Sequence, residues 1–174
     1  MFFLFILALG LLAFFVHIIY VNKIQKKKLG KAKIVELFVL YFIVFNIGVG
    51  GLIAFVYHVF FPEITAAKIG WTTSPFQFEV GIHDGAWGVL AILCIWFRKG
   101  FWFATGIGWS LFMLGAGIGH LRQTINLGNY APYNYLMIFN DIGLAIIVSI
   151  LLWLYYRHVI KHKTVMERVK VLVK

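Results

Sequence analysis

Apolar residues fall into five long stretches, each bounded by polar or basic residues. The stretches cover residues 2–21, 34–60, 75–97, 101–121 and 135–156. Each reaches the roughly 20 residues that a helix needs to cross the hydrocarbon core of a bilayer. The pattern therefore predicts an all-α integral membrane protein with five transmembrane helices, which form one domain over residues 1–156.

The composition supports this class, because 62% of the 174 residues are apolar, against about 45–50% in soluble domains. The surplus apolar surface must face lipid. The first stretch has almost no polar residue apart from His17, so we expect it to lie peripherally beside a four-helix bundle formed by the other four spans. The single cysteine, Cys94, excludes a disulfide framework and a multi-cysteine metal site.

The positive charge of the chain, formally +10, is concentrated in three segments that flank the apolar stretches. All Lys and Arg residues except Lys68 and Arg122 lie at 22–33, 98–99 and 157–174. This distribution follows the positive-inside rule and predicts a protein of the cell membrane with its N-terminus outside and its C-terminus in the cytoplasm. It is not typical of nucleic-acid binding, in which basic residues alternate with aromatic residues or lie on a recognition helix.

The same segments indicate what the protein contacts. Their lysines are expected to lie against anionic lipid headgroups. The stretch 157–174 mixes basic and apolar residues and is expected to form an amphipathic tail on the cytoplasmic face. Gly115 and Gly119 are spaced for close helix contact, which suits a homo-oligomer and packing within one chain equally.

The third apolar stretch differs from the others because it contains three ionisable residues, Glu79, His83 and Asp84. Ionisable residues at membrane depth are costly and are therefore candidates for function. Just before them, Ser74 and Gln77 have the spacing of a capping box, which predicts that the helix begins at about residue 75.

Polar residues of neighbouring stretches fall at the same depth as these three. At a rise of about 1.5 Å per residue, the outer third of the membrane contains polar groups from four predicted helices. They are His58, Glu79, His83, Asp84, His120, Asn140 and Asp141. Arg122 and Asn126 follow in an outer loop predicted at 122–134. The sequence thus predicts a single polar cluster near the outer surface.

One interpretation of this cluster is a metal site. Glu79 and His83 are four residues apart and share a helix face, whereas Asp84 is turned by about 100° from His83. His120 and Asp141 are the best partners from two other helices. Two imidazoles and two carboxylates gathered in a helical bundle suit Zn, Fe or Mn. The supporting polar network would contain His58, Asp84, Arg122, Asn126 and Asn140.

Three other interpretations remain open. If Arg122 pairs with carboxylates of the cluster, the cluster is a purely structural network. Chains of Glu, Asp and His also form proton or cation pathways in transporters and channels, although no ionisable residue continues below Asp84 in spans three to five. A haem held by His58 and His120 is a further alternative, but both residues lie near a membrane interface.

Several motifs carry a resemblance to known proteins. They are SPFQFEVG at 74–81, GIGHLRQ at 117–123, NYAPYN at 129–134, and Asp141. Over about residues 70–145 the chain resembles a family of small prokaryotic polytopic membrane proteins of unknown function. The resemblance implies no particular activity, cofactor or role for any residue.

Overall fold

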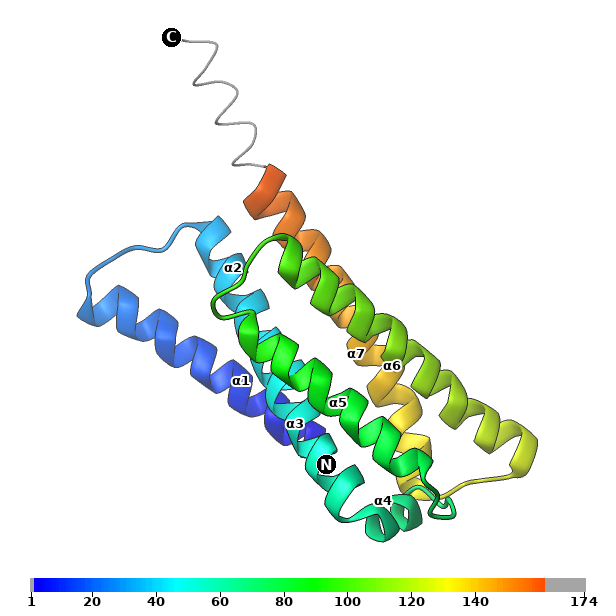
Figure 1. The fold of residues 1–174 in the computed structure, drawn as a ribbon. Helices are drawn as coiled ribbons and strands as arrows, with labels where there is room; N and C mark the ends of the chain where they lie inside the picture. Colours follow the sequence, from blue (N-terminus) through cyan, green and yellow to red (C-terminus); the bar gives the residue numbers. More distant parts are fainter. Residues whose placement is uncertain (1, 162–174) are drawn as a thin grey trace.

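A computed structural model gives the fold of residues 2–161, and every element in that range is helical (Figure 1). The α-helices are α1 (Phe2–Ile19), α2 (Lys31–Phe42), α3 (Gly50–Phe60), α4 (Pro62–Lys68), α5 (Phe76–Leu93), α6 (Gly100–Leu127) and α7 (Pro132–Tyr155). Three π-helical segments, η1 (Tyr20–Ile24), η2 (Ile43–Val49) and η3 (Tyr156–Ile160), continue α1, α2 and α7. Most of the predicted tail, from residue 162 onward, lies outside the described residues.

Four helices in the described range are long and apolar enough to cross a membrane, which agrees with the predicted class of protein. They are Phe3–Ile24, Lys31–Phe60, Gly100–Leu127 and Pro132–Ile160. The π-helical segment η2 joins α2 and α3 into one of these long helices. Helix α5, predicted as a span over 75–97, is 18 residues long and is not among the four, because its polar residues lower its hydropathy.

The closest helix contacts occur within two pairs, α3 with α5 and α6 with α7. A glycine allows the close approach in each pair. A Cβ atom added to Gly51 of α3 would lie 2.7 Å from the backbone oxygen of Asp84. A Cβ atom added to Gly117 of α6 would lie 2.7 Å from the side chain of Ile142 and 3.2 Å from Cβ of Asp141. Helix α1 packs mainly against α2 and η2.

The two ends of the helices differ in chemistry. We call one the basic end, which contains the loop 25–30 and the turn 94–99, and the other the cap end (Figure 1). The cap end is covered by the cap, defined as residues 61–75, and by the loop 128–131. Within the cap, Pro62–Lys68 form the short helix α4.

A buried aromatic core and an ion pair hold the basic end together. The rings of Trp102 and Tyr155 are 4.8 Å apart between centroids, and both side chains are almost fully buried. Glu36 pairs with Lys33 at 2.8 Å and with Arg98 at 3.1 Å. The second contact ties α2 to the turn between α5 and α6.

The start of α5 shows that the predicted capping box was wrong. The helix begins at Phe76 without a side-chain cap. Gln77 is only 3% exposed, and its Oε1 lies 2.6 Å from Nδ1 of His58 on α3. The amide therefore bonds a neighbouring helix instead of the local backbone, a tertiary contact that residue spacing does not reveal.

The predicted outer loop at 122–134 was also wrong over much of its length. Helix α6 continues to Leu127 and ends at Gly128, whose φ of 62° gives the left-handed backbone common after helices. Arg122 and Asn126 consequently lie on the last two turns of a helix.

Candidate functional site

A buried asparagine near the start of α7 organises the polar residues of the cap end. Asn134 is 0% exposed. Its Nδ2 donates to the backbone oxygen of His120 at 3.3 Å, to Oγ1 of Thr124 at 3.0 Å and to the backbone oxygen of Asn129 at 3.2 Å. Because three acceptors surround Nδ2, the orientation of the amide is determined, and Oδ1 faces Nδ1 of His120 at 2.8 Å.

This orientation determines where neutral His120 carries its proton. Oδ1 of Asn134 can only accept, so Nδ1–H of His120 donates to it. The other ring nitrogen, Nε2, lies 3.8 Å from Oδ2 of Asp141, and both side chains are buried. In neutral His120, Nε2 has a lone pair and cannot donate to a carboxylate. The His120–Asp141 pair therefore becomes attractive only when a further proton lies on Nε2 or on Asp141.

Asp141 has two further polar neighbours. Asn140 Nδ2 donates to its Oδ1 at 2.9 Å, while Oδ1 of Asn140 is buried and has no hydrogen-bond partner among the described residues. Asp84 of α5 lies close enough to Asp141 for the two carboxyl groups to interact electrostatically. The charge of Asp84 therefore adds to that of Asp141.

Two aromatic rings complete the cluster on the side of the cap. The indole of Trp71 stacks on the imidazole of His120, with 5.2 Å between centroids and 26° between planes. His58, hydrogen-bonded to Gln77, is close enough to His120 for their charges to interact. The ring of His120 therefore contacts Trp71 of the cap and Asn134 of α7. It also lies near His58 of α3.

The cap is tied to this network through one side chain. Asn129 Nδ2 donates to the backbone oxygen of Ile69 in the cap at 2.8 Å, and Asn129 Oδ1 accepts from the backbone of Ala131 at 3.1 Å. The backbone oxygen of Asn129 accepts from Asn134, as described above. A continuous series of hydrogen bonds therefore links His120 to the cap.

The predicted site residues divide into two groups. His120, Asp141 and Asn140 lie together, and His58 and Asp84 lie beside them. The remaining four, Glu79, His83, Arg122 and Asn126, are exposed.

The exposed residues do not join the predicted metal ligands. His83 packs its ring on Phe112, with 4.2 Å between centroids, and neither Glu79 nor His83 contacts His120 or Asp141 in the described part of the chain. Residues 2–161 contain no group of three or more His, Cys, Asp or Glu side chains placed to hold a metal ion. Arg122 forms no ion pair with any described carboxylate.

Comparison with protein families gave a match to a family of unknown function, DUF6790, over residues 1–161. The chain belongs to DUF6790. Membership of a family of unknown function agrees with the resemblance seen in the sequence motifs, and the match extends well beyond residues 70–145. No curated protein and no solved structure matched the chain.

Sequence reasoning missed three members of the site in this DUF6790 chain: Gln77, Thr124 and Asn134. One of them had a usable signal, because Thr124 follows His120 by four residues and so shares its helix face. Asn134 had no usable signal, because it was assigned to a loop. Only the fold shows that Asn134 is the most deeply buried member of the cluster.

Proposed function

We propose that this DUF6790 protein is a multi-pass membrane protein that binds a proton at the His120–Asp141 pair. The observation that carries the proposal is the tautomer that Asn134 imposes on His120. It leaves Nε2 of His120 and Oδ2 of Asp141 3.8 Å apart, with one proton needed to make the contact favourable.

The charge of the surrounding cluster supports this role. Buried carboxylates within membranes are normally paired with a cation or neutralised by a proton. None of the ion pairs in the described residues brings a Lys or Arg to Asp84 or Asp141. With a protonated His120 the pair with Asp141 is neutral, and Asp84 adds a second acid beside it. The net charge of the cluster therefore depends on how many protons it holds.

The bound proton would affect the cap. A positive charge on His120 lies directly against the indole of Trp71, and an imidazolium on an aromatic face is attractive. The same ring anchors Asn134, whose amide leads to Asn129 and the cap. Proton binding would thus strengthen the contact between the cap and His120, and proton release would weaken this contact.

The proposal includes a topology of five spans. Gly51 of α3 packs on α5 at Asp84, and Gly81 of α5 packs on α3 beside His58, so α5 runs alongside a helix that is long enough to cross the membrane. At about 1.5 Å per residue, its 18 residues cover most of the hydrocarbon core. The lysine-rich loop 25–30 supports an orientation with the basic end in the cytoplasm and the cap outside the cell membrane.

Infrared titration of the protein in lipid vesicles tests the proton site. Between about pH 5 and pH 8, the wild type should take up about one proton per chain on His120, visible in the imidazole ring bands and as a shift of the carboxylate stretching band of Asp141. Asp141→Asn should remove that band. His120→Gln should abolish the pH dependence of the tryptophan emission that is also lost in Trp71→Phe.

Glu79→Gln is the matched control, because Glu79 is an exposed carboxylate near the same end of the membrane and has no contact with the cluster. It should leave both signals unchanged. Identical infrared titrations of the wild type and Asp141→Asn would refute the proposal, as would a band lost equally in Glu79→Gln.

The metal site remains a second candidate, because His120 Nε2 and Asp141 of the same pair would supply two metal ligands. It requires Glu79 and His83 to move toward them. Element analysis of the purified protein distinguishes the two functions. A stoichiometric Zn, Fe or Mn ion that is lost in both His83→Ala and His120→Ala would favour the metal site.

A further inference from the structure

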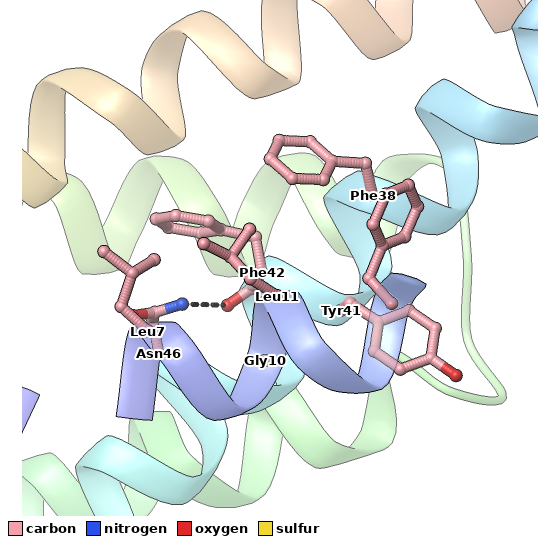
Figure 2. A pocket seen from close by; sticks show the side chains of 8 residues that line it. Leu7, Gly10, Leu11, Phe38, Tyr41, Phe42 and Asn46 are labelled. Carbon is pink, nitrogen blue, oxygen red and sulfur yellow. Dashed lines mark hydrogen bonds between the residues drawn. The ribbon is translucent and has the colours of Figure 1, made fainter. Parts of the chain in front are cut away.

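A small apolar crevice lies between α1 and the helix formed by α2 and η2 (Figure 2). It is lined mainly by Leu7, Leu11, Phe14, Phe38 and Phe42. The two helices pack closely at Gly10, where an added Cβ would lie 2.9 Å from Cβ of Phe45. We call this contact, near the middle of α1, the floor of the crevice.

Toward the basic end the helices separate, and only side chains bridge them. The rings of Phe14 and Phe38 are 5.2 Å apart between centroids. Nδ1 of His17 lies 2.8 Å from the hydroxyl of Tyr41. Beyond this pair the two helices diverge toward their connecting loop (Figure 1). The crevice thus becomes more polar from its floor to the basic end.

The one amide that lines the crevice does not make its floor polar. Asn46 lies in η2, and its Nδ2 donates to the backbone oxygen of Phe42 at 3.3 Å, as the dashed line in Figure 2 marks. This bond directs the amide group toward its own helix and uses one of its two hydrogens. The remaining lining is aliphatic and aromatic, which suits a hydrocarbon chain and not a polar ligand.

A cluster of unpaired cations lies at the open end. Lys23, Lys26, Lys27 and Lys28 are exposed on the end of η1 and in the loop that follows. The ion pairs of the described residues include none of these four lysines. Four positive charges without a protein partner are suited to an anionic group at the membrane surface.

We propose that the α1–α2 hairpin binds one anionic phospholipid, with an acyl chain lying along the crevice and its phosphate at the lysines of the loop. At about 1.5 Å per residue, the helix from Gly10 to Lys23 covers about 20 Å. Half of the roughly 30 Å hydrocarbon core, together with part of the headgroup layer, has a similar depth. One lipid of a single leaflet can therefore contact both features.

The charge of the site favours a lipid over a second copy of the chain. A second copy docked through the same face would bring two lysine clusters together, which is unfavourable in a self-complementary contact. A lipid with an anionic headgroup instead neutralises the lysines. The site is far from His120 and Asp141, so it does not depend on the proposed proton site.

Lipid titration of the detergent-purified full chain, followed by native mass spectrometry, tests the proposal. Phosphatidylglycerol should bind more tightly than phosphatidylcholine with the same acyl chains. Replacing Lys26, Lys27 and Lys28 together with Gln should weaken phosphatidylglycerol binding by about a hundredfold, at about fivefold for each lysine. Leu11→Trp fills the crevice and should weaken the binding of the same lipid without changing the lysines.

Two matched variants provide the controls. Leu12→Trp adds the same ring to the next residue of α1, which is 60% exposed and does not line the crevice, and should leave lipid binding unchanged. Arg157→Gln with Lys161→Gln removes basic charge elsewhere at the basic end and should have little effect.

Three results would overturn the lipid site. They are equal binding of the two lipids, equal effects of Leu11→Trp and Leu12→Trp in folded protein, and equal effects of the two sets of basic substitutions. The lysine variants change only exposed side chains, so they decide the question even if Leu11→Trp does not fold.

Discussion

Asn134→Ala is expected to lower the free energy of unfolding by about 3 kcal/mol or more. Asn134 is fully buried and hydrogen-bonded to His120, Thr124 and Asn129. Truncation leaves several buried polar atoms without partners, and each such loss costs about 1–3 kcal/mol. The tether between the cap and α7 is lost at the same time. Thermal unfolding of the detergent-purified protein measures the change.

Two variants separate the hydrogen bonds from the space that the side chain fills. Asn134→Leu keeps the branched side-chain skeleton without its polar atoms, so a similar loss of stability shows that the polar contacts matter more than the space left by truncation. Asn126→Ala removes an exposed asparagine near the end of α6 and should change stability by less than about 0.5 kcal/mol. Equal melting temperatures for Asn134→Ala and Asn126→Ala would contradict the role given to Asn134.

The level of the polar residues along the helices was predictable from the sequence, whereas the composition of the cluster was not. Helical rise determines how deep a residue lies once a helix end is known, so His58, Asp84, His120 and Asp141 were placed at one level. The direction in which a side chain points around the helix axis is a separate quantity, which the rise does not determine. Spacing shows that Glu79 and His83 share a face, but only packing against α3 shows that this face is exposed and that Asp84 lies nearer α7.

The residues that complete the site explain why its chemistry could not be read from the motifs alone. Gln77 appeared as a local helix cap and Asn134 as part of a loop. Their partners, His58 and His120, are 19 and 14 residues away in the chain. Tertiary contacts of this kind decide the tautomer of His120, and the exposed positions of Glu79 and His83 are what favour a proton site over a metal site.

The same polar residues account for the difference between five predicted spans and four apolar helices. The hydropathy of α5 is lowered by Gln77, Glu79, His83 and Asp84, and two of these belong to or adjoin the buried cluster. A helix that supplies polar groups to a membrane site must lose hydropathy as it gains them. Because the hydropathy of α5 is lowered, the position of α5 in the membrane depends on its packing against α3. This packing can be tested directly.

Gly51→Ala is expected to destabilise the protein by about 3 kcal/mol, at the upper end of the usual range for overpacked positions. A Cβ at this position would lie 2.7 Å from the backbone oxygen of Asp84 and 3.1 Å from the backbone nitrogen of Gly88. Both obstacles are main-chain atoms, so they move only if the whole of α5 moves. Gly51→Val should prevent the two helices from packing and yield little folded protein.

Gly115→Ala is the matched control, because nothing lies within 4 Å of an added Cβ at that glycine. It should not reduce the melting temperature, and the alanine adds helix propensity. Displacing α5 in Gly51→Ala also shifts Asp84 relative to Asp141, so the infrared carboxylate band should change in this variant and not in Gly115→Ala. If Gly51→Ala were as stable as Gly115→Ala, α3 and α5 would not pack along this face, and the argument for α5 as a fifth span would fail.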